Sequence, residues 1–330
     1  MDAILQNGIQ IVLSFQNLGT WLKTPAELLS FLGTEYFFLI VIASVYWVWS
    51  TSLGIRIGLL VMISLGLNGI FKFAFHQPRP YWYDIRVKGM AQEPTFGIPS
   101  GHAQNSVVFF GGIAAWIRRP WAWILAVLFV LFISLSRIYL GVHFPTDILA
   151  GWLAGAVILI VYLALENPVK EWLAHRSTAI QILIGFLGSI IIILFFLFSR
   201  GLLGAYTVPL EWIKNAQMAF PNSIPINPLG TSWIYSIGGA LFGLSMGVAL
   251  LNKQGGLNTS GFWWQRLLRI LVGLVGVIIL YLGLSLVFPN DDNTPANLLR
   301  YLRYAVVGLW ISWLAPLLFF ILKLAEPLRN

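Results

Sequence analysis

The chain has 330 residues, of which 58% are hydrophobic and only 10% are charged, and its formal net charge is +8. This composition is far from that of a soluble globular domain and predicts a polytopic membrane protein. The absence of cysteine excludes structural disulfides, thiolate catalysis and cysteine-ligated zinc. The basic residues are scattered among the loops and form no stripe with interleaved aromatics, so no nucleic-acid partner is expected.

Apolar runs of about 16 to 25 residues are long enough to cross a hydrocarbon core of roughly 30 Å as helices. They predict an all-α bundle of about nine transmembrane helices, at 34–49, 54–75, 102–117, 121–138, 147–166, 179–198, 232–251, 267–288 and 301–325. Residues 1–33 are expected to form an interfacial segment, because the stretch from Ile9 to Phe15 is too short to span and Asp2 replaces the basic start of a signal peptide. We divide the remainder into a core, 34–200, and a C-terminal transmembrane extension without an assigned role, 201–330.

The longest breaks between the expected spans are 76–101 and 199–231, both rich in proline, glycine and polar residues. The second break contains an amphipathic piece from Leu210 to Phe220. We expect this piece to lie on the membrane or to fold over a site.

Lys72 and Arg79 lie seven positions apart, the first in the last turns of an expected helix and the second just after it, before Pro80. Both side chains can therefore reach one point at the membrane surface. An arginine can bind two phosphate oxygens with its guanidinium group, and a lysine adds a point charge. Cations also commonly snorkel at the ends of spans, so neither residue alone indicates a site.

The sequence Pro99-Ser100-Gly101-His102 marks the start of the next expected helix. Ser100 stands where an N-cap is favoured, and Gly101 allows a ligand to approach the backbone closely. The free amide groups of a helix start can bind an anion. His102, in the first turn, could protonate a leaving oxygen, although a single histidine at a helix start is more often structural.

Arg137, His143 and Asp147 surround the turn before the fifth expected span. Pro145 suits the first position of that helix, which places Asp147 in the first turn, four residues after His143. A carboxylate there can accept a hydrogen bond from one imidazole nitrogen and raise the nucleophilicity of the other. The structural alternative is a favourable charge at a helix N-terminus, which contributes roughly 0.3 to 1 kcal/mol.

The three clusters form one pattern: Lys-x6-Arg-Pro, Pro-Ser-Gly-His and Ser-Arg-x5-His-x3-Asp, all expected on one membrane face. This pattern resembles the signature of the type 2 phosphatidic acid phosphatase (PAP2) superfamily, which includes lipid phosphate phosphatases, glucose-6-phosphatase and the soluble vanadium haloperoxidases. The resemblance covers roughly 55–165 and fills every signature position. It implies a helical PAP2/haloperoxidase-like core.

The resemblance also implies a role for each signature residue. His143 would be the nucleophile, Asp147 its orienting partner and His102 the general acid, while the phosphate cradle would consist of Lys72, Arg79, Ser100, Gly101 and Arg137. The implied reaction is a double displacement through a phosphohistidine. Three cations can neutralise the phosphoryl oxygens in place of a metal, so neither a metal nor another cofactor is expected.

A lipid phosphate is the leading expectation for the substrate, because a hydrocarbon chain could enter between helices while the phosphate meets the cations. The stretch from Gln77 to Trp82 also resembles glucose-6-phosphatase, which makes a sugar phosphate an alternative. Asp147 favours the lipid, since lipid phosphate and sphingosine-phosphate phosphatases keep this aspartate and glucose-6-phosphatase lacks it. A lipid phosphotransferase and a non-enzymatic membrane scaffold stay open. The expected partners are the substrate and membrane lipids, and a homo-oligomer is left open.

The positive-inside rule predicts the orientation of the chain. Opposite the three clusters lie ten basic residues in or beside short loops: Arg56, Arg118, Arg119, Lys170, Arg176, Lys253, Arg266, Arg269, Lys323 and Arg329. The side of the clusters keeps seven others: Lys23, Arg86, Lys88, Arg200, Lys214, Arg300 and Arg303. The ten-residue side is therefore expected in the cytoplasm and the active site on the extracytoplasmic face.

Overall fold

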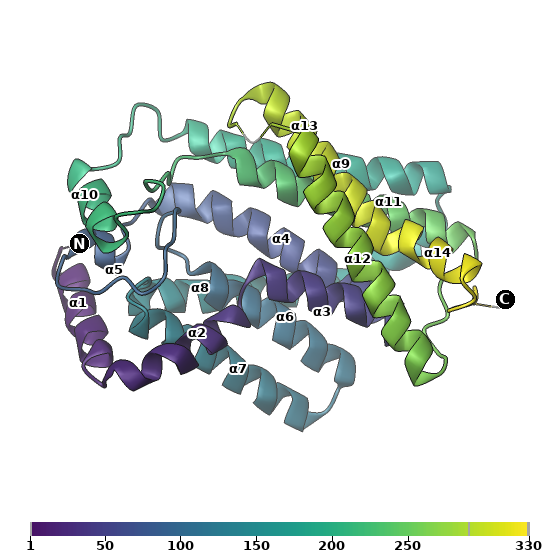
Figure 1. Ribbon diagram of the computed structural model, residues 1–330, viewed down its shortest axis with the longest axis horizontal. Coiled ribbons are helices and arrows are strands. Elements are labelled where there is room, and N and C mark those ends of the chain that lie inside the picture. The colour runs from purple at the N-terminus through teal and green to yellow at the C-terminus, as the bar shows by residue number, and fades with distance from the viewer. Residues whose placement is uncertain (1, 290, 329–330) are drawn as a thin grey trace. The chain divides into compact units, whose positions relative to one another are not determined.

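The computed structural model describes residues 2–289 and 291–328, which form helices and contain no strand (Figure 1). The elements are α1 (Asp2–Gln16), η1 (Thr20–Leu22), α2 (Lys23–Phe31), α3 (Glu35–Val48), α4 (Thr51–Phe75), α5 (Pro80–Tyr83), α6 (Gly101–Ile117), α7 (Pro120–Tyr139), α8 (Pro145–Ala174), α9 (Thr178–Gly201), α10 (Leu210–Ala219), α11 (Ser232–Lys253), α12 (Trp263–Val287), α13 (Thr294–Leu309), the π-helical turn η2 (Trp310–Leu314) and α14 (Ala315–Ile321). Arg329, which is among the ten basic residues counted above, lies outside the described residues.

Seven helical stretches of the described chain are long and apolar enough to cross a membrane. An eighth would result if the bent pair of α2 and α3, whose axes differ by 47°, formed one span. Two of the nine expected spans do not qualify as spans in the structure. These are α3, which has 14 residues, and α6, which has 17 residues and is therefore about 25 Å long. The protein is thus an all-helical integral membrane protein, and the expected count of nine spans is not confirmed.

The chain forms two compact units. The first comprises 1–37, 67–160 and 197–230, and the second comprises 38–66, 161–196 and 231–330. All eight residues predicted to form the site belong to the first unit. The functional division at 33/34 and 200/201 stays a prediction.

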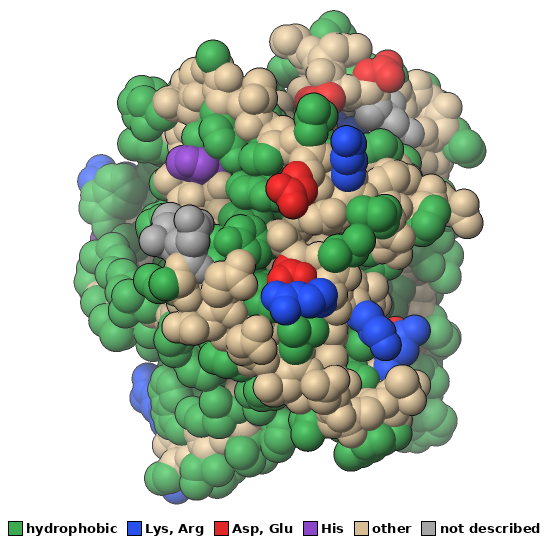
Figure 2. All heavy atoms as spheres, turned by 90° about the vertical axis from the view of Figure 1, so that its left-hand side faces the viewer, with side chains coloured by type: hydrophobic (Ala, Val, Ile, Leu, Met, Phe, Trp, Pro, Cys, Tyr) green, Lys and Arg blue, Asp and Glu red, His purple; other side chains and the backbone are tan. Residues whose placement is uncertain are grey.

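In the first unit, α10 packs against α5, and both lie near α1 (Figure 1). The side chain of Asn215 on α10 donates to the carbonyl of Trp82 at 2.9 Å, and the rings of Phe220 and Tyr81 meet edge to face at 5.8 Å. The amphipathic piece thus packs on α5. Its expected place, on the membrane or over the site, stays a prediction. Figure 2 views the molecule from this side, and the charged side chains visible there are scattered among apolar ones.

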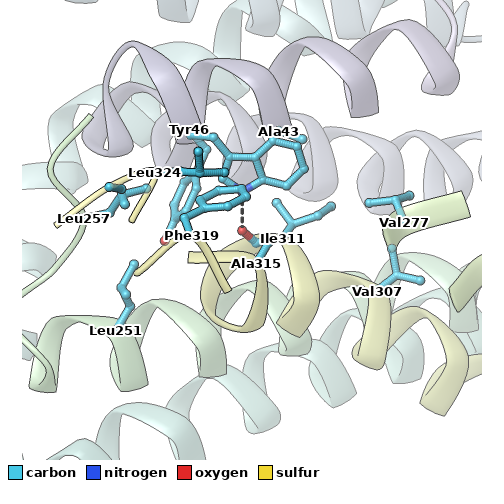
Figure 3. Close-up of a cluster of buried hydrophobic side chains, with 12 residues drawn as sticks. Ala43, Tyr46, Leu251, Leu257, Val277, Val307, Ile311, Ala315, Phe319 and Leu324 are labelled. Carbon is cyan, nitrogen blue, oxygen red and sulfur yellow. Dashed lines mark hydrogen bonds between the residues drawn. The ribbon is translucent and has the colours of Figure 1, made fainter. Parts of the chain in front are cut away.

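The second unit has its core around α3 and the turn η2 (Figure 3). The indole of Trp47 donates to the carbonyl of Ile311, and the hydroxyl of Tyr46 donates to that of Ser312, both at 2.8 Å. Phe319 packs edge to face on the Trp47 ring. These bonds give partners to carbonyl groups in a π-helical turn, where the regular helical pattern is interrupted.

Close packing of α11 against α13 depends on glycines four residues apart on one face of α11: Gly239, Gly243 and Gly247. A methyl group at Gly239 would overlap the carbonyl of Tyr301, and one at Gly243 would overlap that of Ala305. Small residues at this spacing allow helix backbones to approach closely inside a membrane.

Arg269 of α12 is almost fully buried, and it donates to the backbone carbonyls of Trp47, Thr259, Ser260 and Leu324. A buried guanidinium group needs such acceptors because its donors have lost their contact with water. This arginine therefore fixes the loop before α12 and the segment after α14.

Candidate active site

Lys72 and Arg79 both point toward the loop that joins α5 to α6. Lys72, in the last turn of α4, is buried, and its ammonium group donates to Thr95 Oγ1 at 2.8 Å and to the carbonyl of Phe96 at 2.7 Å. Arg79, the N-cap of α5, is fully buried. Its Nε donates to the carbonyl of Thr95 at 2.6 Å and its Nη1 to the carbonyl of Val142 at 3.0 Å. The two cations share Thr95 as a partner and lie in one buried site.

His143, between α7 and α8, has a hydrogen-bond partner at each ring nitrogen. Its Nδ1 lies 3.1 Å from Asp147 Oδ2, and its Nε2 lies 3.1 Å from Arg79 Nη1. A guanidinium group can only donate, so Nε2 accepts and the ring proton belongs on Nδ1, which donates to the carboxylate. The same Asp147 oxygen accepts from the amide of Phe144 at 2.9 Å. The lone pair of the imidazole is therefore on Nε2.

The start of α6 lies beside the start of α8. Ser100 is the N-cap of α6, its hydroxyl accepts from the amide of Ala103 at 3.4 Å, and Gly101 is the first helical residue. The Ser100 amide donates to the backbone carbonyl of Asp147 at 2.9 Å. His102 follows in the first turn, and its Nε2 is buried without a hydrogen-bond partner among the described residues. The two helix starts are thus held together by a backbone bond, with a free imidazole nitrogen nearby.

Arg137, in the last turn of α7, is buried. Its Nη1 donates to Ser30 Oγ at 2.5 Å, and its Nη2 forms an ion pair with Glu93. Its Nε has no hydrogen-bond partner in the described part of the chain. A buried guanidinium nitrogen without an acceptor, like the buried imidazole nitrogen of His102, can receive an oxygen of a ligand.

Glu93 is a residue that the sequence reasoning missed. Its Oε2 lies 3.4 Å from Arg79 Nη2, and its Oε1 contacts Arg137 Nη2. The available signal was weak: the chain has only 12 acidic residues, and this one lies in the break between the first two clusters, nine residues before His102. A carboxylate in a proline-rich loop ordinarily faces water, so its spacing alone does not indicate a site.

Asn68 is a second residue that sequence reasoning missed, four residues before Lys72 on the same face of α4. Its side-chain amide donates to the carbonyl of Pro99 at 3.2 Å and to Gln104 Oε1 at 2.9 Å. Asn68 therefore holds the start of α6 against α4. The helical spacing from Lys72 was the signal that could have found it.

Burial and the surrounding charges shift the pKa values of His143, between α7 and α8, and of Glu93, between α5 and α6. Burial, followed by the positive charges of Arg79, Arg137 and Lys72, lowers the pKa of His143 well below its usual value. The imidazole therefore stays neutral and keeps its lone pair at physiological pH. Burial alone would raise the pKa of Glu93, but Arg79 and Arg137 outweigh it and hold that pKa below its usual range. Glu93 is therefore an anion.

The structure brings all eight predicted site residues into one unit, around the ends of α4 and α7 and the starts of α6 and α8. The three cations approach the loop of Glu93, and the imidazole of His143 lies against Arg79. Within 2–289 and 291–328, no three His, Asp or Glu side chains are grouped closely enough to hold a metal ion. The arrangement can bind a tetrahedral anion beside a neutral imidazole.

All eight predicted site residues fall within a part of the chain that matches a known family. Residues 53–170 match the model of the PAP2 superfamily, and 235–327 match that of the PAP2 superfamily phosphatase transmembrane extension. An undecaprenyl-diphosphatase of Sulfolobus acidocaldarius is 32% identical over 50% of this chain and 74% of its own length. The chain belongs to the PAP2 superfamily, and it is a phosphatase.

Two further likenesses differ in extent. Human glucose-6-phosphatase 3 is 27% identical over 76% of this chain and 77% of its own length. The crystal structure of a phosphatidylglycerolphosphate phosphatase from Bacillus subtilis is 23% identical and superimposes with a TM-score of 0.46, covering 51% of this chain and 89% of that one.

Replacing Arg79 or Arg137 by lysine is predicted to impair phosphate release strongly, because an ammonium group cannot bind two oxygens at once. We expect a loss of at least about 2 kcal/mol of transition-state stabilisation, or roughly 30-fold in kcat/KM. The measurement is phosphate release from p-nitrophenyl phosphate by the purified variants. Arg86→Lys is the matched control, because Arg86 pairs with Asp84 at the surface. Wild-type kcat/KM in either variant would remove that arginine from the cradle.

Proposed function

We propose that the protein is a metal-independent phosphomonoesterase that hydrolyses a lipid phosphate through a phosphohistidine intermediate. The observation that carries the proposal is the state of His143, whose Nδ1 donates to Asp147 while its Nε2 accepts from Arg79. A neutral imidazole oriented by a carboxylate is an activated nucleophile. Three buried cations beside it suit an anionic electrophile.

In the first proposed step, Nε2 of His143 attacks phosphorus and the bond between phosphorus and the ester oxygen breaks. Arg79 must exchange its contact with Nε2 for a phosphate oxygen before the attack. Lys72, Arg79 and Arg137 neutralise the phosphoryl oxygens, and the amides at Ser100 and Gly101 add donors at a helix start. His102 donates a proton to the departing alkoxide, which leaves as the alcohol.

In the second proposed step, His102, now neutral, removes a proton from water. The resulting hydroxide attacks phosphorus, the bond from phosphorus to Nε2 breaks, and inorganic phosphate leaves with His143 restored. Asp147 accepts the Nδ1 hydrogen bond throughout and stabilises the positive charge that the phosphorylated imidazole carries. His102 ends the cycle protonated and ready for the next ester.

An apolar groove in the first unit supports a lipid as the substrate. It has a volume of about 240 Å³, lies between α6, α7 and α8, and is lined by Val107, Gly111, Trp123, Ala126, Val127, Val130, Leu131, Trp152 and Leu159. Val107 is five residues after His102, which corresponds to about 7.5 Å along the helix. A hydrocarbon chain in this groove would leave its phosphate near the cations. The relative from S. acidocaldarius is named for a lipid diphosphate.

A sugar phosphate is the second candidate, and a specific observation favours it. The similarity to human glucose-6-phosphatase 3 covers 76% of this chain, whereas that to the archaeal undecaprenyl-diphosphatase covers 50%. The longer alignment must include part of the C-terminal extension. That similarity does not account for the apolar groove between α6, α7 and α8.

A substitution that narrows the apolar groove distinguishes a lipid phosphate from a sugar phosphate as the substrate. Val130→Phe is predicted to raise KM for a long-chain lipid phosphate about fourfold or more, because it fills the space of at least one methylene group, which contributes about 0.8 kcal/mol. Its KM for soluble p-nitrophenyl phosphate should stay unchanged. Leu128→Phe, an exposed position on the same helix, is the control. Equal effects on both substrates, or a wild-type preference for glucose 6-phosphate over every lipid phosphate, would contradict the lipid assignment.

We further propose that the site faces the extracytoplasmic side. The support is the distribution of basic residues, ten on the opposite side and seven on the side of the site, mostly in or beside short loops. A lipid phosphatase with this orientation would act on the outer leaflet.

Cysteine labelling tests this orientation directly, because the chain has no cysteine of its own. Ser260→Cys and Asn222→Cys place one thiol at each of two exposed positions in loops on opposite sides of the expected membrane. In intact cells, the cysteine at position 222 should react with a membrane-impermeant maleimide, and the one at 260 should react only after permeabilisation. The reverse order of labelling would put the active site in the cytoplasm.

A further inference from the structure

The carboxylate of Glu93 occupies the donors that the proposed mechanism assigns to phosphate. One oxygen lies 3.4 Å from Arg79 Nη2, and the other contacts Arg137 Nη2. The two guanidinium groups come from different elements, the N-cap of α5 and the last turn of α7. Each carboxylate oxygen of Glu93 thus contacts a different arginine, which is how the two arginines would bind two oxygens of a phosphate.

The charge balance explains why an internal anion is present. Arg79 and Arg137 are 1% and 2% exposed at their side chains, whereas Glu93 is 21% exposed. Buried guanidinium groups without a counterion are costly, so an empty cradle favours any carboxylate that can reach it. Glu93 supplies the negative charge for both arginines and, at 21% exposure, remains in contact with solvent.

The loop that carries Glu93 is held by its backbone, while the Glu93 side chain pairs with the two arginines. The hydroxyl of Tyr81 donates to the carbonyl of Glu93 at 3.3 Å and accepts from its amide at 3.2 Å. The flanking residues Gln92 and Pro94 are exposed. A rotation of the Glu93 side chain can therefore release both arginines toward a ligand without moving the backbone of the loop.

We propose that Glu93 is an internal competitor of the substrate phosphate, which must displace its carboxylate from Arg79 and Arg137 in order to bind. This inference rests on the proposed function, since it assumes that these arginines bind the substrate. The affinity measured for a phosphate is then the intrinsic affinity multiplied by the fraction of molecules with free arginines. The carboxylate also keeps the arginines in place between turnovers.

The test compares Glu93→Gln with the wild type and with Glu27→Gln, which removes an exposed carboxylate 3.9 Å from Lys23 on α2. Tungstate, a tetrahedral dianion, is titrated calorimetrically into each protein in nanodiscs. Because the competitor is removed, Glu93→Gln should bind tungstate at least about threefold more tightly than the other two proteins. Unchanged or weaker binding would overturn the proposal and make Glu93 only a support for the arginines.

A second variant covers the case in which Glu93→Gln does not fold. Glu93→Asp keeps the charge but shortens the side chain by one methylene group, so it can no longer reach both guanidinium groups, and it should bind tungstate more tightly than the wild type. Unchanged or weaker binding in this variant counts equally against the competitor role. Phosphate release by the wild type is measured separately. A wild type that neither binds tungstate nor releases phosphate would refute the proposed function itself, whereas an active wild type with unimproved variants would refute only the role of Glu93.

Discussion

The burial of three cations beside one neutral imidazole is the constraint on which the rest of the site depends. Charges removed from water are costly unless acceptors replace the lost hydration. Lys72 and Arg79 meet this cost with backbone carbonyls and Thr95 from the loop between α5 and α6, and Arg137 meets it with Ser30 and Glu93. The loop is therefore part of the site, because it supplies the acceptors that let the cations converge.

The same constraint sets the state of the nucleophile. Burial, followed by the nearby positive charges, lowers the pKa of His143 and keeps it neutral. Because Arg79 donates to Nε2, the ring proton stays on Nδ1, which faces Asp147. Helix ends provide the positions: α4 and α7 end at the site, and α6 and α8 begin there, joined by the bond between the Ser100 amide and the Asp147 carbonyl. The chemistry of the site therefore follows from four helix ends held together by backbone contacts.

Much of the site could be predicted from the sequence, because its residues lie at helix ends that prolines, an N-cap serine and apolar runs make recognisable. Pro80 marks the start of the helix that follows Lys72 and Arg79. Pro145 marks the start of α8, which places Asp147 in the first turn, four residues after His143. Glu93 and Ser30 could not be assigned in this way, since their partners are distant in sequence and only the packed structure brings them together. Asn68 carried a weaker signal, its helical spacing from Lys72, but its contact with Gln104 appears only in the fold. The expected count of nine included two runs of only 16 residues, 34–49 and 102–117, and in the structure these form α3, which follows a bend, and α6, which has 17 residues.

The central claim is that His143 carries the phosphoryl group during turnover. Phosphohistidine survives in alkali and is lost in acid, so the direct measurement is an alkaline quench of the enzyme during turnover of p-nitrophenyl phosphate, followed by mass spectrometry of the peptide that contains His143. The account predicts phosphate on His143, a larger amount of it in His102→Ala, where hydrolysis of the intermediate is slowed, and none in His143→Ala. Phosphate on another residue, or histidine labelling that persists in His143→Ala, would contradict it.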